Sequence, residues 1–191
     1  MNTVEHLAQA FIGESMARNR YTMYAKAART EGYEQIASLF LETADNEREH
    51  AKWFFKMMNE ANGTQTIPKI KVESEVPNVL GTTKDNLVAA IAGEHYEYSS
   101  MYPEIADVAQ KEGFPQIATR VRAIAKAELH HEGRYQKLLK ELEGATIFKK
   151  GKKIVWVCRV CGYMHEATEP PLKCRSCDHE KGFFQVQSEN Y

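Results

Sequence analysis

Long hydrophobic runs are missing from this sequence of 191 residues. Mean hydropathy is -0.53, and no stretch approaches the ~18 apolar residues that a membrane-spanning helix needs. Residues 1–11 also lack the basic segment followed by an apolar one that is typical of a signal peptide. We therefore expect a cytoplasmic protein with no membrane partner.

An excess of charge of either sign is missing as well, because the formal net charge is -1. Without an overall basic field, nucleic acid is not an expected partner. Cysteine is absent outside one short segment: all four cysteines lie between positions 158 and 177, in two Cys-x-x-Cys pairs. This spacing is typical of metal binding and argues against a disulfide framework.

Helical periodicity is what the sequence has in abundance. Apolar residues recur at spacings of three and four, which predicts four long amphipathic helices, over residues 3–30, 34–60, 82–111 and 114–143. The segment 63–82 has no such period and contains the helix breakers Pro68, Pro77 and Gly81. Its length of about 20 residues is unusual for a bundle loop and suits the single long crossover of a ferritin-like four-helix bundle.

The two halves of this helical region repeat each other. Glu14 matches Glu94 at an offset of 80, whereas Glu47 matches Glu128 at an offset of 81. One extra residue inside a helix is commonly absorbed as a π-bulge, often at a functional site. We therefore predict a π-bulge in the third helix, within about residues 95–103.

Four glutamates fall within the apolar stripes of the helices, where an unpaired carboxylate is costly. They are Glu14, Glu47, Glu94 and Glu128. Glu47 and Glu128 are each followed three positions later by a histidine, His50 and His131, so both side chains share one helix face. Two Glu-x-x-His pairs with two further inward carboxylates predict a di-metal site. Mixed carboxylate and imidazole ligation suits iron, with manganese or zinc as alternatives.

Three further features accompany this pattern. Glu97 lies one turn after Glu94 without a counterpart in the first half, so it is either an extra ligand of an asymmetric site or a solvated side chain. Tyr21 and Tyr102 follow the inner faces; they either pack in the core or donate hydrogen bonds to ligand carboxylates. His130 competes with His131, but only His131 has the required spacing, so we expect His130 outside the ligand set.

The pattern changes after the fourth helix. Residues 147–148, 154–157 and 183–186 resemble short strands, and 149–153 a basic turn. This region is too small to fold on its apolar area alone, and it contains four thiolates that can hold iron or a structural zinc: Cys158, Cys161, Cys174 and Cys177. Gly162 after Cys161 permits a positive φ, so that amides can point at sulfur. We predict two domains, 1–146 and 147–191.

These motifs resemble the rubrerythrin family over nearly the whole chain. The matching segments are residues 13–21, 47–52 and 93–98, the pair Glu128-x-x-His131, and the rubredoxin-like Cys158-x-x-Cys161-Gly162-Tyr163 with its partner pair. One departure is Asp178, where free rubredoxins often have glycine. Because aspartate tolerates the left-handed region better than most residues, we expect this turn to survive.

The resemblance implies a ferritin-like diiron bundle followed by a rubredoxin-like iron domain. It further implies a non-haem diiron peroxidase that reduces hydrogen peroxide to water. In the implied ligand set, Glu47 and Glu128 bridge two irons. The first iron is also bound by Glu14 and, according to redox state, by His50 or Glu97. The second iron is also bound by Glu94 and His131. His50 and Glu97 would thus exchange during turnover, next to Tyr21 and Tyr102.

The resemblance also implies an electron supply, in which the four-cysteine iron is refilled by an external NAD(P)H-dependent donor. His131 lies 12 residues before the predicted end of the fourth helix, roughly 18 Å at ~1.5 Å per residue. We therefore expect a head-to-tail homodimer, in which each Cys domain serves the other chain. Rival functions are a ferroxidase or iron store, a non-catalytic zinc protein, and a diiron oxidase with an organic substrate, whose pocket the sequence does not locate.

Overall fold

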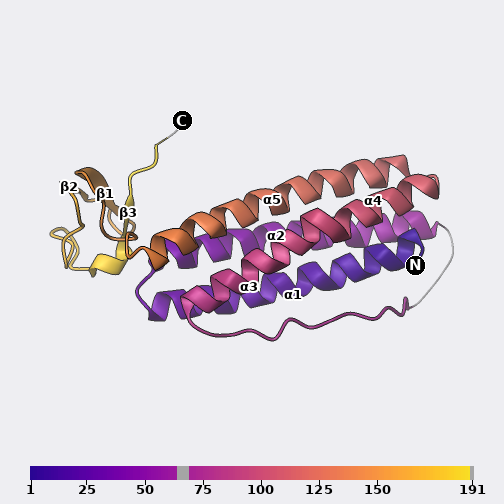
Figure 1. The fold of residues 1–191 in the computed structure, drawn as a ribbon, viewed down its shortest axis with the longest axis horizontal. Coiled ribbons are helices and arrows are strands. Elements are labelled where there is room, and N and C mark those ends of the chain that lie inside the picture. Colours follow the sequence, from indigo (N-terminus) through magenta and orange to yellow (C-terminus); the bar gives the residue numbers. More distant parts are fainter. Residues whose placement is uncertain (64–68, 190–191) are drawn as a thin grey trace.

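The structure is a computed structural model, and it describes residues 1–63 and 69–189. Its larger part is a bundle of four long helical rods, and Figure 1 shows its elongated shape. The rods are α1 (Thr3–Thr30), α2 (Glu34–Asn62), α3 (Thr83–Tyr96) continued by η1 (Glu97–Met101) and α4 (Tyr102–Lys111), and α5 (Pro115–Glu143). The predicted four-helix bundle is confirmed. Within the described residues, no helix is long and apolar enough to cross a membrane.

The third rod contains the π-bulge that the change of offset predicts. Residues Glu97–Met101 form a π-helical segment, and the amide of Tyr102 donates to the carbonyl of Glu97, five residues earlier. The extra residue is absorbed in a segment that begins three residues after Glu94. The prediction is therefore confirmed, and the bulge lies at the centre of the bundle.

The two hairpin turns preserve the duplication. Gly32 and Gly113 have φ of 81° and 88°, values that glycine adopts without strain. The glutamate before each glycine caps the other hairpin: Glu31 accepts from the amide of Thr83, and Glu112 from the amide of Thr3, both at 2.9 Å. Each turn thus satisfies a free amide at the start of a helix in the other half.

The described part of the crossover, residues 69–82, runs along the outside of the bundle and returns the chain to the start of α3 (Figure 1). Two side chains of α1 hold it: Gln9 Nε2 donates to the carbonyl of Glu73 at 2.8 Å, and the Tyr24 hydroxyl to that of Val79 at 2.9 Å. Residues 64–68 of the predicted crossover lie outside the described residues. The crossover therefore lies against α1, and its anchors are carbonyl groups.

Apolar residues form two separate clusters, one on each side of the bundle's midpoint. The first contains Leu7, Phe54, Ile105 and Val121, and the second Tyr24, Phe40, Leu87 and Tyr135, among others. On each helix the predicted inward glutamates lie between the residues of these two clusters. The carboxylates are therefore enclosed by hydrocarbon at both ends, and this keeps water away from them.

The C-terminal region is a small antiparallel sheet in the order β2-β1-β3. The strands are β1 (Ile154–Cys158), β2 (Met164–Ala167) and β3 (Phe184–Val186), with the short 3-10 helix η2 (Lys181–Phe183) before β3. The strand predicted at 147–148 is wrong, because these residues form a turn. Phe148 stacks on Tyr33 of the bundle at 6.1 Å, so packing on the bundle replaces strand pairing. The boundary between 146 and 147 falls between α5 and β1 and stays a prediction.

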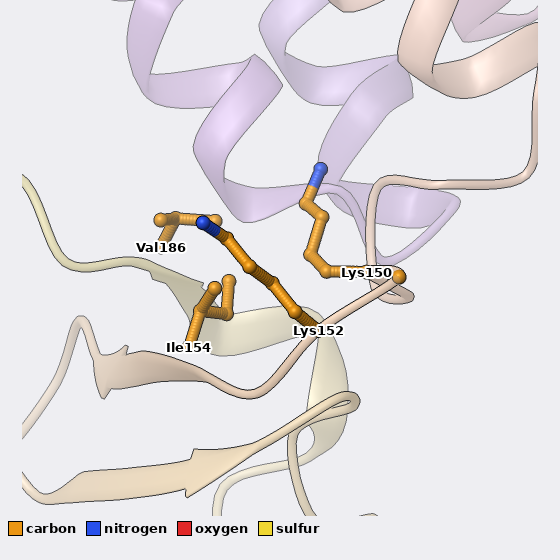
Figure 2. A pocket seen from close by; sticks show the side chains of 5 residues that line it. Lys150, Lys152, Ile154 and Val186 are labelled. Carbon is orange, nitrogen blue, oxygen red and sulfur yellow. The ribbon is translucent and has the colours of Figure 1, made fainter.

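The sheet packs against the end of the bundle where α1 turns into α2. Lys150 forms an ion pair with Glu141 of α5. A pocket of about 680 Å³ lies beside this contact, lined by residues 150–152 together with Ile154 and Val186. Figure 2 shows Lys150 extending toward the bundle helices and Lys152 toward Val186. The basic turn predicted at 149–153 therefore helps to join the sheet to the bundle.

A pair of glycines sets the distance between the sheet and the bundle. A Cβ at Gly182 would lie 2.4 Å from the carbonyl oxygen of Gly32, which is backbone and cannot move aside. We expect Gly182→Ala to push the sheet away from the bundle and to cost about 1–3 kcal/mol of stability. Faster cleavage of the segment 144–153 in limited proteolysis would report this change.

The matched control is Gly151→Ala in the same region, where an added Cβ meets nothing within 4 Å. We expect it to leave the free energy of unfolding within about 0.5 kcal/mol of the wild type. Equal cleavage rates in the two variants would contradict the close packing of Gly182 on Gly32.

Candidate metal centres

All four helical rods contribute to one polar cluster at the midpoint of the bundle. Glu14 comes from α1, Glu47 and His50 from α2, Glu94 from α3, and Glu128 and His131 from α5. The four carboxylates are at most 1% exposed and His131 is 3% exposed. Helical spacing directs each Glu-x-x-His pair to the same face. The fold thus brings together all six residues of the predicted di-metal pattern.

The six side chains form two overlapping groups of possible metal ligands. The first consists of Glu14, Glu47, His50 and Glu128, and the second of Glu47, Glu94, Glu128 and His131. Within each group the ligand atoms lie within 4.8 Å of one another. Glu47 and Glu128 belong to both groups, as carboxylates that bridge two ions must.

The individual contacts repeat with the symmetry of the duplication. Nδ1 of His50 lies 2.9 Å from Oε2 of Glu47 and 2.9 Å from Oε1 of Glu128. Nδ1 of His131 lies 3.3 Å from the other oxygen of Glu47 and 2.8 Å from the other oxygen of Glu128. Each bridging carboxylate therefore presents one oxygen to each histidine.

Most of these atoms are buried without a hydrogen-bond partner among the described residues. They include both oxygens of Glu47 and of Glu128, one oxygen each of Glu14 and Glu94, and Nδ1 of both histidines. Orphaned buried polar atoms are rare in folded proteins and call for a ligand. With both imidazoles neutral, as metal ligands are, the four carboxylates carry a charge that two divalent cations would balance. The donor set therefore fits two metal ions with oxygen and nitrogen ligation.

Without metal, the protonation of this cluster is strongly perturbed. Burial raises the pKa of Glu94 to about 8 and raises the pKa values of Glu14 and Glu97 well above their usual range. Burial alone would lower the pKa of His131, but the close carboxylates of Glu128, Glu47 and Glu94 raise it to about 12. The metal-free fold thus retains protons that metal ions would displace.

Because the metal-free fold retains these protons, we predict that the stability of the metal-free protein falls as pH rises. The proton on Glu94 stabilises the metal-free fold below pH ~4.5, and this contribution is lost between there and its pKa of about 8. The contribution of His131 is lost from pH ~6.5 upward, toward its pKa of about 12. The lowered pKa of Glu128 adds no slope above pH ~4.5.

Calorimetry of the metal-free protein between pH 5 and pH 9 should therefore show a melting temperature that falls by several degrees, at about 2–4 °C for each kcal/mol lost. The metal-loaded protein is the control, and its melting temperature should not fall over this range because metal keeps the carboxylates ionised. A metal-free protein whose melting temperature rises from pH 5 to pH 9 would contradict the assigned protonation.

Two buried tyrosines hold the outer carboxylates. The Tyr21 hydroxyl donates to Glu94 Oε1, and the Tyr102 hydroxyl donates to Glu14 Oε1, both at 2.5 Å. Each tyrosine is at most 1% exposed, and burial raises the pKa values of both well above the usual range. They therefore stay protonated donors, and each fixes the orientation of a carboxylate from the other half of the duplication.

Three candidates differ in their positions. Glu97 starts the π-helical segment and belongs to neither ligand group, although its partly buried side chain borders the cluster. His130 is exposed, as expected. The sequence reasoning missed Asn46, whose Oδ1 lies 3.2 Å from Nε2 of His131. Its counterpart in the repeat is Ala127, so no internal repetition pointed to it.

The four cysteines form the second cluster. The sulfur atoms of Cys158 and Cys177 are 3.7 Å apart, and those of Cys161 and Cys174 are 3.6 Å apart. A tetrahedron of thiolates at ~2.3 Å from a metal has edges of about 3.8 Å, so the arrangement fits one tetrahedral ion. The backbone amide of Tyr163 lowers the pKa of Cys161 to about 6, which favours the thiolate that a metal needs.

Both cysteine turns have the backbone that this site requires. Gly162 has φ of 75° and Asp178 has φ of 57°. The amide of Gly162 donates to the carbonyl of Cys158 at 2.9 Å, and the amide of Asp178 donates to that of Cys174 at 3.0 Å. The prediction that the turn survives with aspartate at position 178 is confirmed.

Comparisons with known proteins agree with both clusters. A family model described as rubrerythrin matches residues 5–139, and one described as the rubredoxin-like domain of rubrerythrin matches residues 156–185. The chain is 56% identical to a putative rubrerythrin of Methanocaldococcus jannaschii, with 99% of this chain and 94% of the relative covered. It is 38% identical to a rubrerythrin of Nitratidesulfovibrio vulgaris, covering 99% and 96%.

A solved structure of nigerythrin in a mixed-valent state is similar as well. It has a TM-score of 0.64 and 32% identity, and the match covers 98% of this chain and 87% of that one. The residues of a diiron carboxylate site and of a four-cysteine rubredoxin-like site are both present in the chain. The chain belongs to the rubrerythrin family.

Proposed function

We propose that this protein is a non-haem diiron peroxidase that reduces hydrogen peroxide to water in the cytoplasm, as a defence against oxidative stress. The observation that carries the proposal is the pairing of two different metal clusters on one chain. One has two ligand groups that share Glu47 and Glu128, and the other has four thiolates. Two irons in the first cluster would supply the two electrons that peroxide reduction needs, and one iron held by thiolates would return electrons singly.

The ligand roles follow the sharing of carboxylates. Glu47 and Glu128 would hold both ions, and Glu94 with His131 would complete the ligands of one of them. Glu14 would hold the other ion together with His50 or Glu97. His50 lies within 3.6 Å of Glu14, and Glu97 lies one turn beyond Glu94 on the π-bulge. Exchange between a neutral imidazole and a carboxylate suits the change from ferrous to ferric iron.

The protein side chains around the ions have separate tasks. Tyr21 and Tyr102 hold Glu94 and Glu14 through short hydrogen bonds and are buried hydroxyls that can offer a proton to a departing oxygen. Asn46 faces the outer nitrogen of His131 and fixes its ring. The two apolar clusters exclude water from the carboxylates.

The electron supply requires a second chain. The sheet is packed at the bundle end (Figure 1), at Gly32 and Tyr33, whereas the carboxylate cluster lies between the two apolar clusters of the bundle. A distance of roughly 18 Å along α5 separates His131 from that end. We infer a head-to-tail homodimer in which each four-cysteine site serves the partner's irons, and an external NAD(P)H-dependent donor refills that site.

Steady-state assays with hydrogen peroxide and with ferrous ions as the two substrates test the proposal. Iron-loaded protein with an electron donor should consume one hydrogen peroxide for every two electrons and produce water without releasing dioxygen. The alternative of a ferroxidase or iron store predicts no need for electrons and oxidation of many added ferrous ions per chain. Mineral formation with no donor-dependent loss of peroxide would overturn the peroxidase.

A further inference from the structure

A cavity of about 890 Å³ lies between α1, the α3–η1 segment and the crossover. Glu97 lines it, and so do Gly13 and Gly93, the residues directly before Glu14 and Glu94. The cavity therefore lies beside the buried carboxylate cluster, on the side of the π-bulge, and Glu97 stands between the two. Its volume is within the range of small-molecule sites, about 300–1,000 Å³, and is far larger than hydrogen peroxide requires.

Neither backbone conformation nor close packing requires glycine at these two positions, and the cavity is what glycine leaves open there. Neither has a positive φ, and glycine inside a helix costs about 1 kcal/mol relative to alanine. A Cβ at Gly13 would approach nothing nearer than Glu97 Oε1 at 4.0 Å, and one at Gly93 nothing nearer than Arg20 Nη2 at 3.9 Å. Side chains at these positions would fill the cavity without meeting backbone, so the glycines keep it open.

One hydrogen-bond donor in the cavity wall lacks an acceptor. Arg20 lines the cavity, and its Nε is buried without a hydrogen-bond partner among the residues that the structure describes. Such a group is costly unless a ligand or water satisfies it. Glu73 and Glu75 of the crossover also line the cavity and disfavour an anion. Met16 and Met101 add apolar surface. An uncharged molecule with a polar end and an apolar body matches this lining.

We propose that this cavity binds uncharged organic hydroperoxides as further substrates of the carboxylate cluster, with the peroxide end toward Glu97 and Arg20 and the organic group against Met16 and Met101. The inference rests on the peroxidase function proposed above and extends its substrate class. The O–O bond breaks, and the hydroperoxide takes up two protons and two electrons. The electrons come from the same external donor through the four-cysteine site. One alcohol and one water are formed.

Binding can be tested without turnover. The probe is cumyl alcohol, the uncharged product of cumene hydroperoxide, added to full-length protein loaded with diamagnetic zinc and labelled with ¹³C at the methionine methyl groups. We expect the NMR signals of Met16 and Met101 to shift. The signal of Met23 should stay, because Met23 lies on the same helix but does not line the cavity and is 45% exposed.

Turnover supplies the second readout, the ratio of kcat/KM for cumene hydroperoxide to kcat/KM for hydrogen peroxide. Filling the cavity with Met16→Trp should lower this ratio at least about tenfold, within the discrimination of an apolar pocket. The matched control Met23→Trp, on the same helix outside the cavity, should leave it unchanged.

The outcomes separate this inference from the function on which it rests. Reduction of hydrogen peroxide with no methionine shifts and an unchanged ratio in Met16→Trp would overturn the cavity's role and leave the peroxidase intact. Methionine shifts without reduction of either peroxide would overturn the peroxidase, and with it the use of the cavity for a substrate.

Discussion

Glu128→Ala should abolish peroxide reduction and the binding of iron in the bundle. Glu128 is fully buried, and its two oxygens face His50 and His131 at 2.9 and 2.8 Å. Its loss removes one ligand from both groups at once, so we expect iron analysis to find only the ion of the four-cysteine site. Turnover should fall by more than the 10–100-fold that is typical of losing a residue outside the ligand set.

Glu132→Ala is the matched control for this prediction. Glu132 is also buried, at 6% exposed, and lies one turn further along α5. Its carboxylate accepts from Gln136 and contacts His95, away from both ligand groups. We expect about 1–3 kcal/mol of lost stability with full iron content. Normal iron content in Glu128→Ala would contradict the bridging role.

The double change Cys158→Ser and Cys174→Ser should separate the two clusters. Both cysteines are 1% exposed and pack with Trp156 and Phe184 in the small core. Because metal binding contributes about 10–16 kcal/mol to the folding of such small domains, we expect the sheet to unfold and Trp156 fluorescence to shift to the red. The bundle should keep its irons and react once with peroxide after chemical reduction, while donor-linked turnover disappears.

The control is Arg175→Ala, which changes an exposed residue in the second cysteine turn and should keep the sheet folded.

The two inactive variants, Glu128→Ala and the double cysteine variant, can also be combined as a heterodimer isolated through two affinity tags. If each four-cysteine site serves the partner's irons, the intact sheet of Glu128→Ala will serve the intact bundle of the double variant, and turnover will return to about half. A heterodimer that stays inactive would contradict electron transfer between chains.

Much of the bundle and its site was predictable because it is periodic and duplicated. The spacing of apolar residues sets the helices, and the inward glutamates stand out since burial of a lone carboxylate is costly. The change of offset between Glu14/Glu94 and Glu47/Glu128 located the π-bulge at Glu97–Met101. These features are local in sequence or repeat within it, so a single chain was enough to read them.

Features that depend on contacts between distant segments were not predictable. β2 has a polar sequence and becomes a strand because the Cys158–Gly162 turn folds it back against β1. Residues 147–148 lose their strand because Phe148 meets Tyr33. Asn46 has no counterpart in the repeat, and the cavity beside Glu97 exists only because the crossover lies over Gly13 and Gly93.

Electron flow from the four-cysteine site to peroxide is tested most directly by anaerobic stopped-flow mixing of the fully reduced, iron-loaded protein with hydrogen peroxide, followed through the visible absorbance of the ferric four-cysteine site. We expect this absorbance to return rapidly, at a rate that rises with peroxide concentration, and dioxygen to restore it only slowly. A four-cysteine site that stays reduced in the presence of peroxide, or that responds equally fast to dioxygen, would contradict the peroxidase function.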